Sequence, residues 1–249
     1  GADIYDFTGY TKTATVATGA GAHGITLGTG TEKITGGAGV ETVQVAATGH
    51  LASTDVLTGG DGTDIINFTT AMTVTDAQFT NVTTFENITA GNVILNITLG
   101  AQAKEAGIVS VVVGNASNII NASAYTSTVL TLTGGTGADS IRGGTGADIM
   151  SGGDGADTYV FNATGALNGT DVITMVVADD KLDFSNMGSF AFQNTTEVAF
   201  NATGDVNITN KIILLVDADG AASTDQIAEI VADLEGAGTA MNLQSGGKA

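Results

Sequence analysis

The sequence lacks cysteine, proline and tryptophan, and it has 7 basic residues against 26 acidic ones among 249 residues. Without cysteine, disulfide frameworks and thiolate sites for zinc or iron–sulfur clusters are excluded, so a bound metal would need oxygen ligands or one of the two histidines. The formal net charge of −19 repels phosphate backbones, which argues against nucleic acid as a partner. This composition favours a hard cation as the ligand.

The apolar content is nevertheless that of a folded protein, because 43% of the residues are hydrophobic. No apolar run approaches the roughly 20 residues that a transmembrane helix needs, so no transmembrane segment is predicted. The opening residues 1–7 resemble the middle of a motif and not a signal peptide. We therefore expect the sequence to be a fragment of a longer protein.

A nine-residue repeat occurs three times without a gap, at 134–142, 143–151 and 152–160, and a fourth copy stands alone at 59–67. Each copy has glycine at positions 1, 2 and 4, aspartate at position 6 and a large apolar residue at position 8. Glycine permits the positive φ angles of a tight turn, so each copy predicts a turn followed by a short strand with position 8 in the core. Aspartates stacked in neighbouring coils would repel one another, and a bridging dication would reverse this repulsion.

Residues 18–44 keep the same period in three degenerate copies, with His23, Glu32 and Glu41 at position 6. The longer glutamates could still reach a cation, but together with the neutral histidine they favour a coil that packs without metal. The opening residues align with the end of an intact copy, so Asp3 is expected to end an earlier array that lies outside this sequence.

The uninterrupted array resembles the RTX (repeats-in-toxin) family of secreted bacterial proteins. The resemblance implies a parallel β-roll in which two nonapeptides make one turn and Ca²⁺ lies between loops on the same edge. It also implies that Asp139 and Asp157 share one edge, with Asp148 on the other. The candidate carboxylate ligands outside the array are Asp171 and Asp180 in the closing strands, Asp64 and Asp3. The implied loop ligands are Gly134, Gly135, Thr136, Gly137, Gly143, Gly144, Thr145, Gly146, Gly152, Gly153, Asp154 and Gly155.

We expect an all-β chain that forms one parallel β-solenoid, or RTX β-roll, with a short C-terminal helix. Residues 68–133 lack the glycine loops and are rich in β-branched residues, which predicts short strands in calcium-free coils. A capping box at 223–226, an apolar face and Gly236 predict the helix near the C-terminus. The predicted divisions are 1–67 with degenerate repeats and one intact repeat, 68–133 with calcium-free coils, 134–185 with the β-roll and its closing strands, and 186–249 as a capping region.

Asn-x-Ser/Thr triplets are unusually frequent between Asn67 and Asn207. Glycan acceptors are one explanation. Residues i and i+2 share one face of a strand, so polar ladders on the outside of the solenoid explain the same excess, and we favour the ladders.

The sequence predicts no enzyme, because His23 and His50 are its only histidines and neither has a nucleophile motif beside it. The spread of RTX arrays through a long, lysine-poor solenoid resembles the lattice-forming part of Gram-negative surface-layer (S-layer) proteins exported by type I secretion. The resemblance implies an extracellular structural protein of the cell surface that folds on calcium binding, self-assembles into a two-dimensional lattice and is anchored by a region outside this fragment. The alternative is a noncatalytic RTX module of a secreted protease or lipase, or of a large adhesin.

Overall fold

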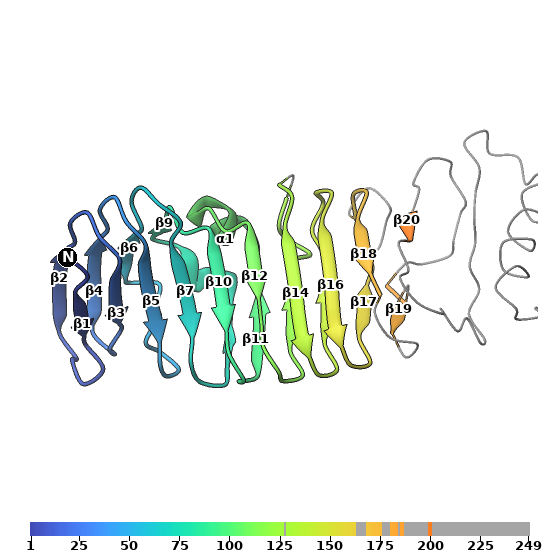
Figure 1. Cartoon of the computed structure of the whole chain (residues 1–249), viewed down its shortest axis with the longest axis horizontal. Helices are drawn as coiled ribbons and strands as arrows, with labels where there is room; N and C mark the ends of the chain where they lie inside the picture. The colour runs from blue at the N-terminus through green and yellow to red at the C-terminus, as the bar shows by residue number, and fades with distance from the viewer. Residues whose placement is uncertain (127, 163–167, 176–179, 184, 187–198, 201–249) are drawn as a thin grey trace, which may run out of the picture. The chain divides into compact units, whose positions relative to one another are not determined.

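Parallel strands stack coil upon coil along the chain and form a β-solenoid (Figure 1). The computed structural model describes residues 1–126, 128–162, 168–175, 180–183, 185–186 and 199–200. These residues belong to one compact unit, which spans residues 1–188 and 197–207. Every strand pair among the described residues is parallel, which confirms the predicted all-β solenoid.

The strands form three sheets, and strands that are neighbours in a sheet come from successive coils. The ten-stranded sheet contains, in order, β1 (Ile4–Asp6), β3 (His23–Thr26), β5 (Glu41–Val45), β7 (Ile65–Phe68), β10 (Asn87–Ala90), β12 (Ser110–Val112), β14 (Thr131–Thr136), β16 (Ile149–Asp154), β18 (Val172–Thr174) and β20 (Ala199–Phe200). The six-stranded sheet contains β19 (Lys181–Asp183), β17 (Thr158–Val160), β15 (Ser140–Arg142), β13 (Ile119–Asn121), β11 (Leu95–Thr98) and β8 (Met72–Val74). The four-stranded sheet contains β2 (Thr13–Ala17), β4 (Thr31–Thr35), β6 (Val56–Thr58) and β9 (Val82–Thr83).

The core is a set of columns in which one apolar side chain from each coil stacks on the next. The column of the ten-stranded sheet follows the strand register, and each of its members is at most 3% exposed. It consists of Ile25, Val43, Ile66, Ile88, Val111, Leu132, Met150 and Ile173. Position 8 of the nonapeptides therefore points into the core as predicted, and each such side chain contributes about 1.5–3 kcal/mol through burial.

The strands predicted between residues 93 and 133 are present as β11, β12 and β14. Upstream of these strands, four apolar residues occur at three-residue steps. Phe79, Val82, Phe85 and Ile88 are all buried, and they lie in or beside the short 3-10 helix η1 (Asp76–Phe79), β9 and β10.

The short helix α1 (Ala101–Ala106) was not predicted, and it corrects the expectation that residues 68–133 form only strands. Its N-terminus is capped from another coil, because the Asp76 carboxylate accepts hydrogen bonds from the backbone N–H groups of Gly100, Gln102 and Ala103 at 2.7–3.1 Å. A carboxylate at a helix N-terminus satisfies free N–H groups and interacts favourably with the helix dipole. A cap that is contributed 24 residues earlier leaves no local sequence signal.

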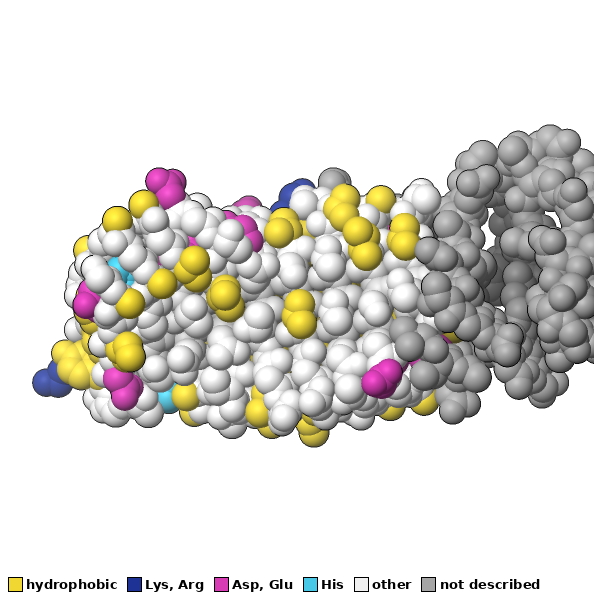
Figure 2. Space-filling view, viewed as in Figure 1, with side chains coloured by type: hydrophobic (Ala, Val, Ile, Leu, Met, Phe, Trp, Pro, Cys, Tyr) yellow, Lys and Arg dark blue, Asp and Glu magenta, His cyan; other side chains and the backbone are white. Residues whose placement is uncertain are grey.

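The outer surface of the ten-stranded sheet is almost free of charge. From β3 to β18, the two outward side chains of each strand are Gly, Thr, Gln, Ile, Asn, Ser or Val, and Asp154 at the loop end of β16 is the exception. Thr89 Oγ1 donates to Asn67 Oδ1 at 3.0 Å across adjacent strands, which is the polar ladder expected of the Asn-x-Thr triplets. On the face drawn in Figure 2, charged side chains are few and most of the described surface is uncharged.

The helix predicted near the C-terminus lies outside the described residues, as does most of the predicted capping region 186–249. Within that region β20 pairs with β18, so the ten-stranded sheet continues past the predicted closing strands. In the part of the chain that the structure describes, no helix is long and apolar enough to span a bilayer.

Candidate calcium-binding site

The aspartates at position 6 of the array lie at the start of strands, on two edges of the solenoid. Asp139 and Asp157 precede β15 and β17 of the six-stranded sheet, and Asp148 precedes β16 of the ten-stranded sheet. Their side chains are at most 2% exposed. The structure therefore brings Asp139 and Asp157 together on one edge and places Asp148 on the other, as the alternation of repeats implies.

One oxygen of each carboxylate is held by the backbone of the preceding coil. The backbone N–H of Asp139 donates to Asp157 Oδ1 at 2.8 Å, and that of Asp157 donates to Asp180 Oδ1 at 3.0 Å. On the opposite edge, the N–H of Asp148 donates to Asp171 Oδ1 at 2.9 Å. Asp171 and Asp180, both predicted as additional ligands, therefore continue the two ladders.

The second oxygen has a different role, since Asp139 Oδ2 and Asp157 Oδ2 are buried and have no hydrogen-bond partner. Each lies over the first glycine of its own repeat, where a Cβ on Gly134 or Gly152 would collide with it. Position 1 is therefore glycine because any side chain there would collide with the aspartate of the same repeat. The sequence alone did not reveal this reason. A buried carboxylate oxygen without a donor is costly unless a cation binds it.

Asp148 differs in detail from the aspartates of the other edge. Its Oδ2 accepts a hydrogen bond from the Gly144 backbone N–H at 2.7 Å, and its Oδ1 accepts one from Leu130 at 2.9 Å. A Cβ on Gly143 would lie 2.6 Å from Asp148 Oδ2, so the position-1 glycine again makes room for the carboxylate.

The glycines at positions 2 and 4 allow the loops of successive coils to stack closely. Gly135, Gly137, Gly153 and Gly155 all have positive φ angles, between 95° and 133°. The α-carbons of Gly153 and Gly155 lie against the carbonyl oxygens of Gly135 and Gly137, so close that a Cβ would not fit. Loop carbonyl oxygens are thereby concentrated at the same edge as the free carboxylate oxygens.

Burial raises the pKa of these carboxyl groups. The pKa of Asp139 and of Asp148 lies above its ordinary value because burial disfavours the ionised form. Burial raises the pKa of Asp157 to about 6, with a smaller contribution from the negative charges of Asp180 and Asp139. Burial also raises the pKa of Asp171 to about 7, to which the charge of Asp148 adds. The two edges therefore favour binding of positive charge near neutral pH.

These donors fit a hard divalent cation. Ca²⁺ takes six to eight oxygen ligands, and backbone carbonyls are common among them. Within the described ranges, no three His, Asp or Glu side chains gather into a cluster that could hold a metal on its own. An ion at these edges must therefore combine carboxylates of successive coils with loop carbonyls, and its bound charge would neutralise the stacked aspartates.

The two candidate ligands that precede the array in the sequence, Asp3 and Asp64, lie in different surroundings. The Asp3 side chain is 59% exposed, and its carboxylate lies 3.4 Å from Nδ1 of His23, which begins β3 and is buried. Asp64 is fully buried, and its Oδ2 has no partner. Its neighbours on the edge are Glu41 and Glu86, which the sequence did not identify because they are 23 and 22 residues away and not 18.

Asn118 is a further residue of the ladder that the sequence analysis missed. Its backbone N–H donates to Asp139 Oδ1 at 2.7 Å, and its own Oδ1 accepts from Leu95 at 2.9 Å. Its Nδ2 donates to the loop carbonyls of Ala116 and, at 3.4 Å, Gly114. The amide therefore supplies the loop with donors. The signal is a degenerate nonapeptide at 113–121 with asparagine at position 6.

Comparison with known families agrees with this geometry. The family model of the RTX calcium-binding nonapeptide repeat (four copies) matches residues 52–69 and 131–159. The chain carries RTX repeats. These repeats bind calcium, and the RTX domain is a structural one that is generally noncatalytic. Comparisons with curated proteins and with solved structures gave no significant match.

The RTX segments contain part of the ladders described above, and Asp171 and Asp180 lie outside them. The second segment includes Asp139, Asp148 and Asp157 with their glycine loops, and the first includes Asp64. The match does not extend to the degenerate copies at 18–44 or to Asn118.

Proposed function

We propose that the chain is a calcium-dependent structural protein of a bacterial cell surface that self-assembles into an S-layer lattice after type I secretion. RTX repeat proteins are typically secreted, and the solenoid with its calcium-binding repeats is the part of the proposal with direct support. The site residues are those of the two ladders and their glycine loops. The anchor to the cell is a region outside this sequence.

Calcium acts in this proposal as a folding switch. Where calcium is scarce, the buried carboxylates of stacked coils repel one another and destabilise the array, so the chain can be exported in an extended form. Extracellular calcium modules have dissociation constants of about 10⁻⁴ to 10⁻³ M, which suits an ion that is bound only outside the cell. Its binding free energy then becomes folding free energy.

The outer face of the ten-stranded sheet supports assembly. Its outward side chains between β3 and β18 are uncharged apart from Asp154, so two such faces can approach without desolvating ion pairs. Three of its apolar side chains, Val112, Ile149 and Val172, are 42–47% exposed. Such exposed side chains on a regular surface favour contact between copies.

The observation that carries the proposal is the position of buried, unpartnered carboxylate oxygens in both RTX segments, at Asp64, Asp139 and Asp157. Calcium would therefore stabilise coils in separate parts of the solenoid. This argues against the tail of a secreted enzyme, because such a tail needs only one compact array.

Electron microscopy of the full-length protein tests the proposal. In millimolar calcium we expect ordered two-dimensional sheets, which should disappear in chelator and re-form when calcium is restored. The matched control is the exposed charge change Glu105→Gln, which should leave the sheets intact. Folded, calcium-loaded particles that stay separate would contradict the lattice and favour the adhesin or enzyme-module alternative.

A further inference from the structure

The degenerate coils near the N-terminus contain a second pair of buried carboxylates. Glu41 and Asp64 begin or precede adjacent strands β5 and β7 of the ten-stranded sheet, and both side chains are fully buried. The Glu41 backbone N–H donates to Asp64 Oδ1 at 2.7 Å. The same contact joins Asp139 to Asp157 in the array, at 2.8 Å.

The free oxygens of this pair are also arranged as in the array. Glu41 Oε2 and Asp64 Oδ2 are buried without a hydrogen-bond partner. A Cβ on Gly59 would collide with Asp64 Oδ2, and a Cβ on Gly36 would lie 2.9 Å from Glu41 Oε2. Both oxygens therefore lie over the position-1 glycine of their own repeat, as the oxygens of Asp139 and Asp157 do.

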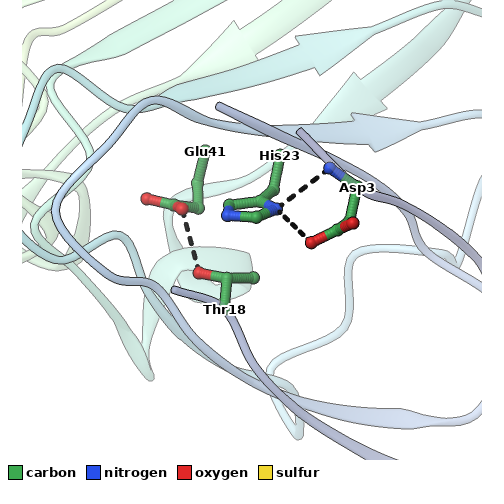
Figure 3. A network of polar contacts seen from close by, with 4 residues as sticks. All are labelled: Asp3, Thr18, His23 and Glu41. Atoms are coloured by element: carbon green, nitrogen blue, oxygen red, sulfur yellow. Dashed lines mark hydrogen bonds and ion pairs between the residues drawn. The ribbon is translucent and has the colours of Figure 1, made fainter. Parts of the chain in front are cut away.

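The other oxygen of Glu41 is already in use. Thr18 Oγ1 donates to Glu41 Oε1 at 2.9 Å, which fixes the carboxylate and leaves Oε2 as its available acceptor (Figure 3). On the far side of Asp64, its backbone N–H donates to Glu86 Oε2 at 2.7 Å, so a third carboxylate continues the same edge. The longer glutamate side chain thus reaches the place that aspartate takes in the intact repeats.

Asn118 shows how a side chain of this fold can provide hydrogen-bond donors to loop carbonyls. There the amide Nδ2 donates to the loop carbonyls of Gly114 and Ala116, so the loop carbonyls have a donor. Glu41 and Asp64 cannot provide such a donor when ionised, because a carboxylate is an acceptor only.

In the part of the chain that the structure describes, no Lys or Arg forms an ion pair with Glu41, Asp64 or Glu86. The buried His23 is in register with Glu41 on the adjacent strand, and its Nδ1 is paired with the Asp3 carboxylate. Burial raises the pKa of Asp64 to about 6, and the charges of Glu41 and Glu86 add to this effect. The pair is therefore electrostatically incomplete near neutral pH.

We propose that Glu41 and Asp64 bind a divalent cation of the calcium type between the coils of β5 and β7. The ligands are Glu41 Oε2 and Asp64 Oδ2, and loop carbonyls of the two coils complete the coordination. Carboxylate and carbonyl oxygens select a hard cation. The degenerate repeats thus keep a metal site in which glutamate replaces aspartate, and this site is independent of any lattice.

The test compares calcium binding by the full-length protein with that of the variant Glu41→Gln/Asp64→Asn. Native mass spectrometry after titration with Ca²⁺ counts the ions, and hydrogen exchange measures backbone protection in β5 and β7. We expect the variant to bind one ion fewer and to lose the calcium-induced protection of β5 and β7. Protection of β16 in the array should still increase with calcium, as it should in the exposed control Glu105→Gln.

An unchanged ion count in the variant, or β5 and β7 amides in the unaltered protein that do not respond to calcium, would overturn the proposal. Binding of Zn²⁺ at this edge in preference to Ca²⁺ would overturn it as well. If the double variant does not fold, the nearly isosteric Glu41→Gln alone should raise the calcium concentration for half-maximal protection of β5 by at least about 10-fold. If the array itself does not bind calcium, the backbone protection of β16 will not change with calcium. This result is distinct from a failure at Glu41 and Asp64.

Discussion

Without calcium, the stability of the solenoid should fall as the pH rises from about 5 to about 8. In the folded chain the pKa is about 6 for Asp64 and Asp157 and about 7 for Asp171, whereas the ordinary value is 3.8. A carboxyl group whose pKa is raised by folding holds its proton more tightly in the folded state. Its stabilising effect is therefore present at low pH and is lost as the pH rises through the folded pKa.

The size of the effect follows from these differences. A shift of about two pKa units, as at Asp157, corresponds to about 3 kcal/mol. The effective dielectric constant at buried sites in proteins is well above that of a dry interior, so we take about 1–2 kcal/mol for each group. Three such groups predict a loss of about 3–6 kcal/mol between about pH 4 and pH 8, which is a large part of the 5–15 kcal/mol that is typical of a folded domain.

Urea unfolding followed by far-ultraviolet circular dichroism measures this loss, in metal-free buffer and in calcium of about 1 mM. The urea midpoint of the metal-free protein should fall from pH 5 to pH 8, and calcium should restore it at pH 8. Asp6 and Asp183 are exposed and their pKa values are lowered by hydrogen bonds from Thr8 and Ser185, so they titrate below this window. A metal-free protein that is as stable at pH 8 as at pH 5 would refute the reasoning.

Three further predictions concern the ladder on the six-stranded sheet. Asp139→Ala together with Asp157→Ala should raise the calcium concentration needed for folding, and an unchanged midpoint in a calcium titration would show that these are not the ligands. Gly152→Ala should weaken calcium binding and also lower the stability of the metal-free protein, because the new methyl group takes the space of the buried Asp157 carboxylate; calorimetric titration with Ca²⁺ and urea unfolding measure the two effects. Asn118→Asp should add one calcium ion by native mass spectrometry and destabilise the metal-free form, since the amide donors to the loop are lost; an unchanged ion count would contradict the role given to Asn118.

The architecture was predictable because every nonapeptide has the same pattern of glycines and one apolar residue. Glycine turns followed by one buried apolar side chain predict short parallel strands, and Ile141, Met150 and Tyr159 are buried as position 8 requires. The resemblance to RTX rolls, in which two nonapeptides make one turn, also implies that Asp139 and Asp157 lie on the same edge. Periodicity of this kind is local in sequence, so it can be read without knowing the fold.

Contacts between coils of unequal length could not be predicted in this way. Glu41 and Asp64 are in register only because an additional loop lengthens the intervening coil, and their separation of 23 residues has no counterpart in the period of nine. Helix α1 could not be predicted either, because its N-terminus is capped by Asp76, which lies 24 residues earlier in the preceding coil. The role of Asn118 becomes visible only when its amide is seen to donate to the loop carbonyls that an ion would otherwise bind.

Anomalous X-ray diffraction from crystals grown in calcium is the most direct test of the central claim that stacked carboxylates hold calcium between coils. A difference peak is expected next to Asp139 Oδ2 and Asp157 Oδ2, with carboxylate and carbonyl oxygens at about 2.3–2.6 Å from it. Well-ordered loops in millimolar calcium with no such peak, and with both carboxylate oxygens hydrogen-bonded to protein or water, would contradict the claim.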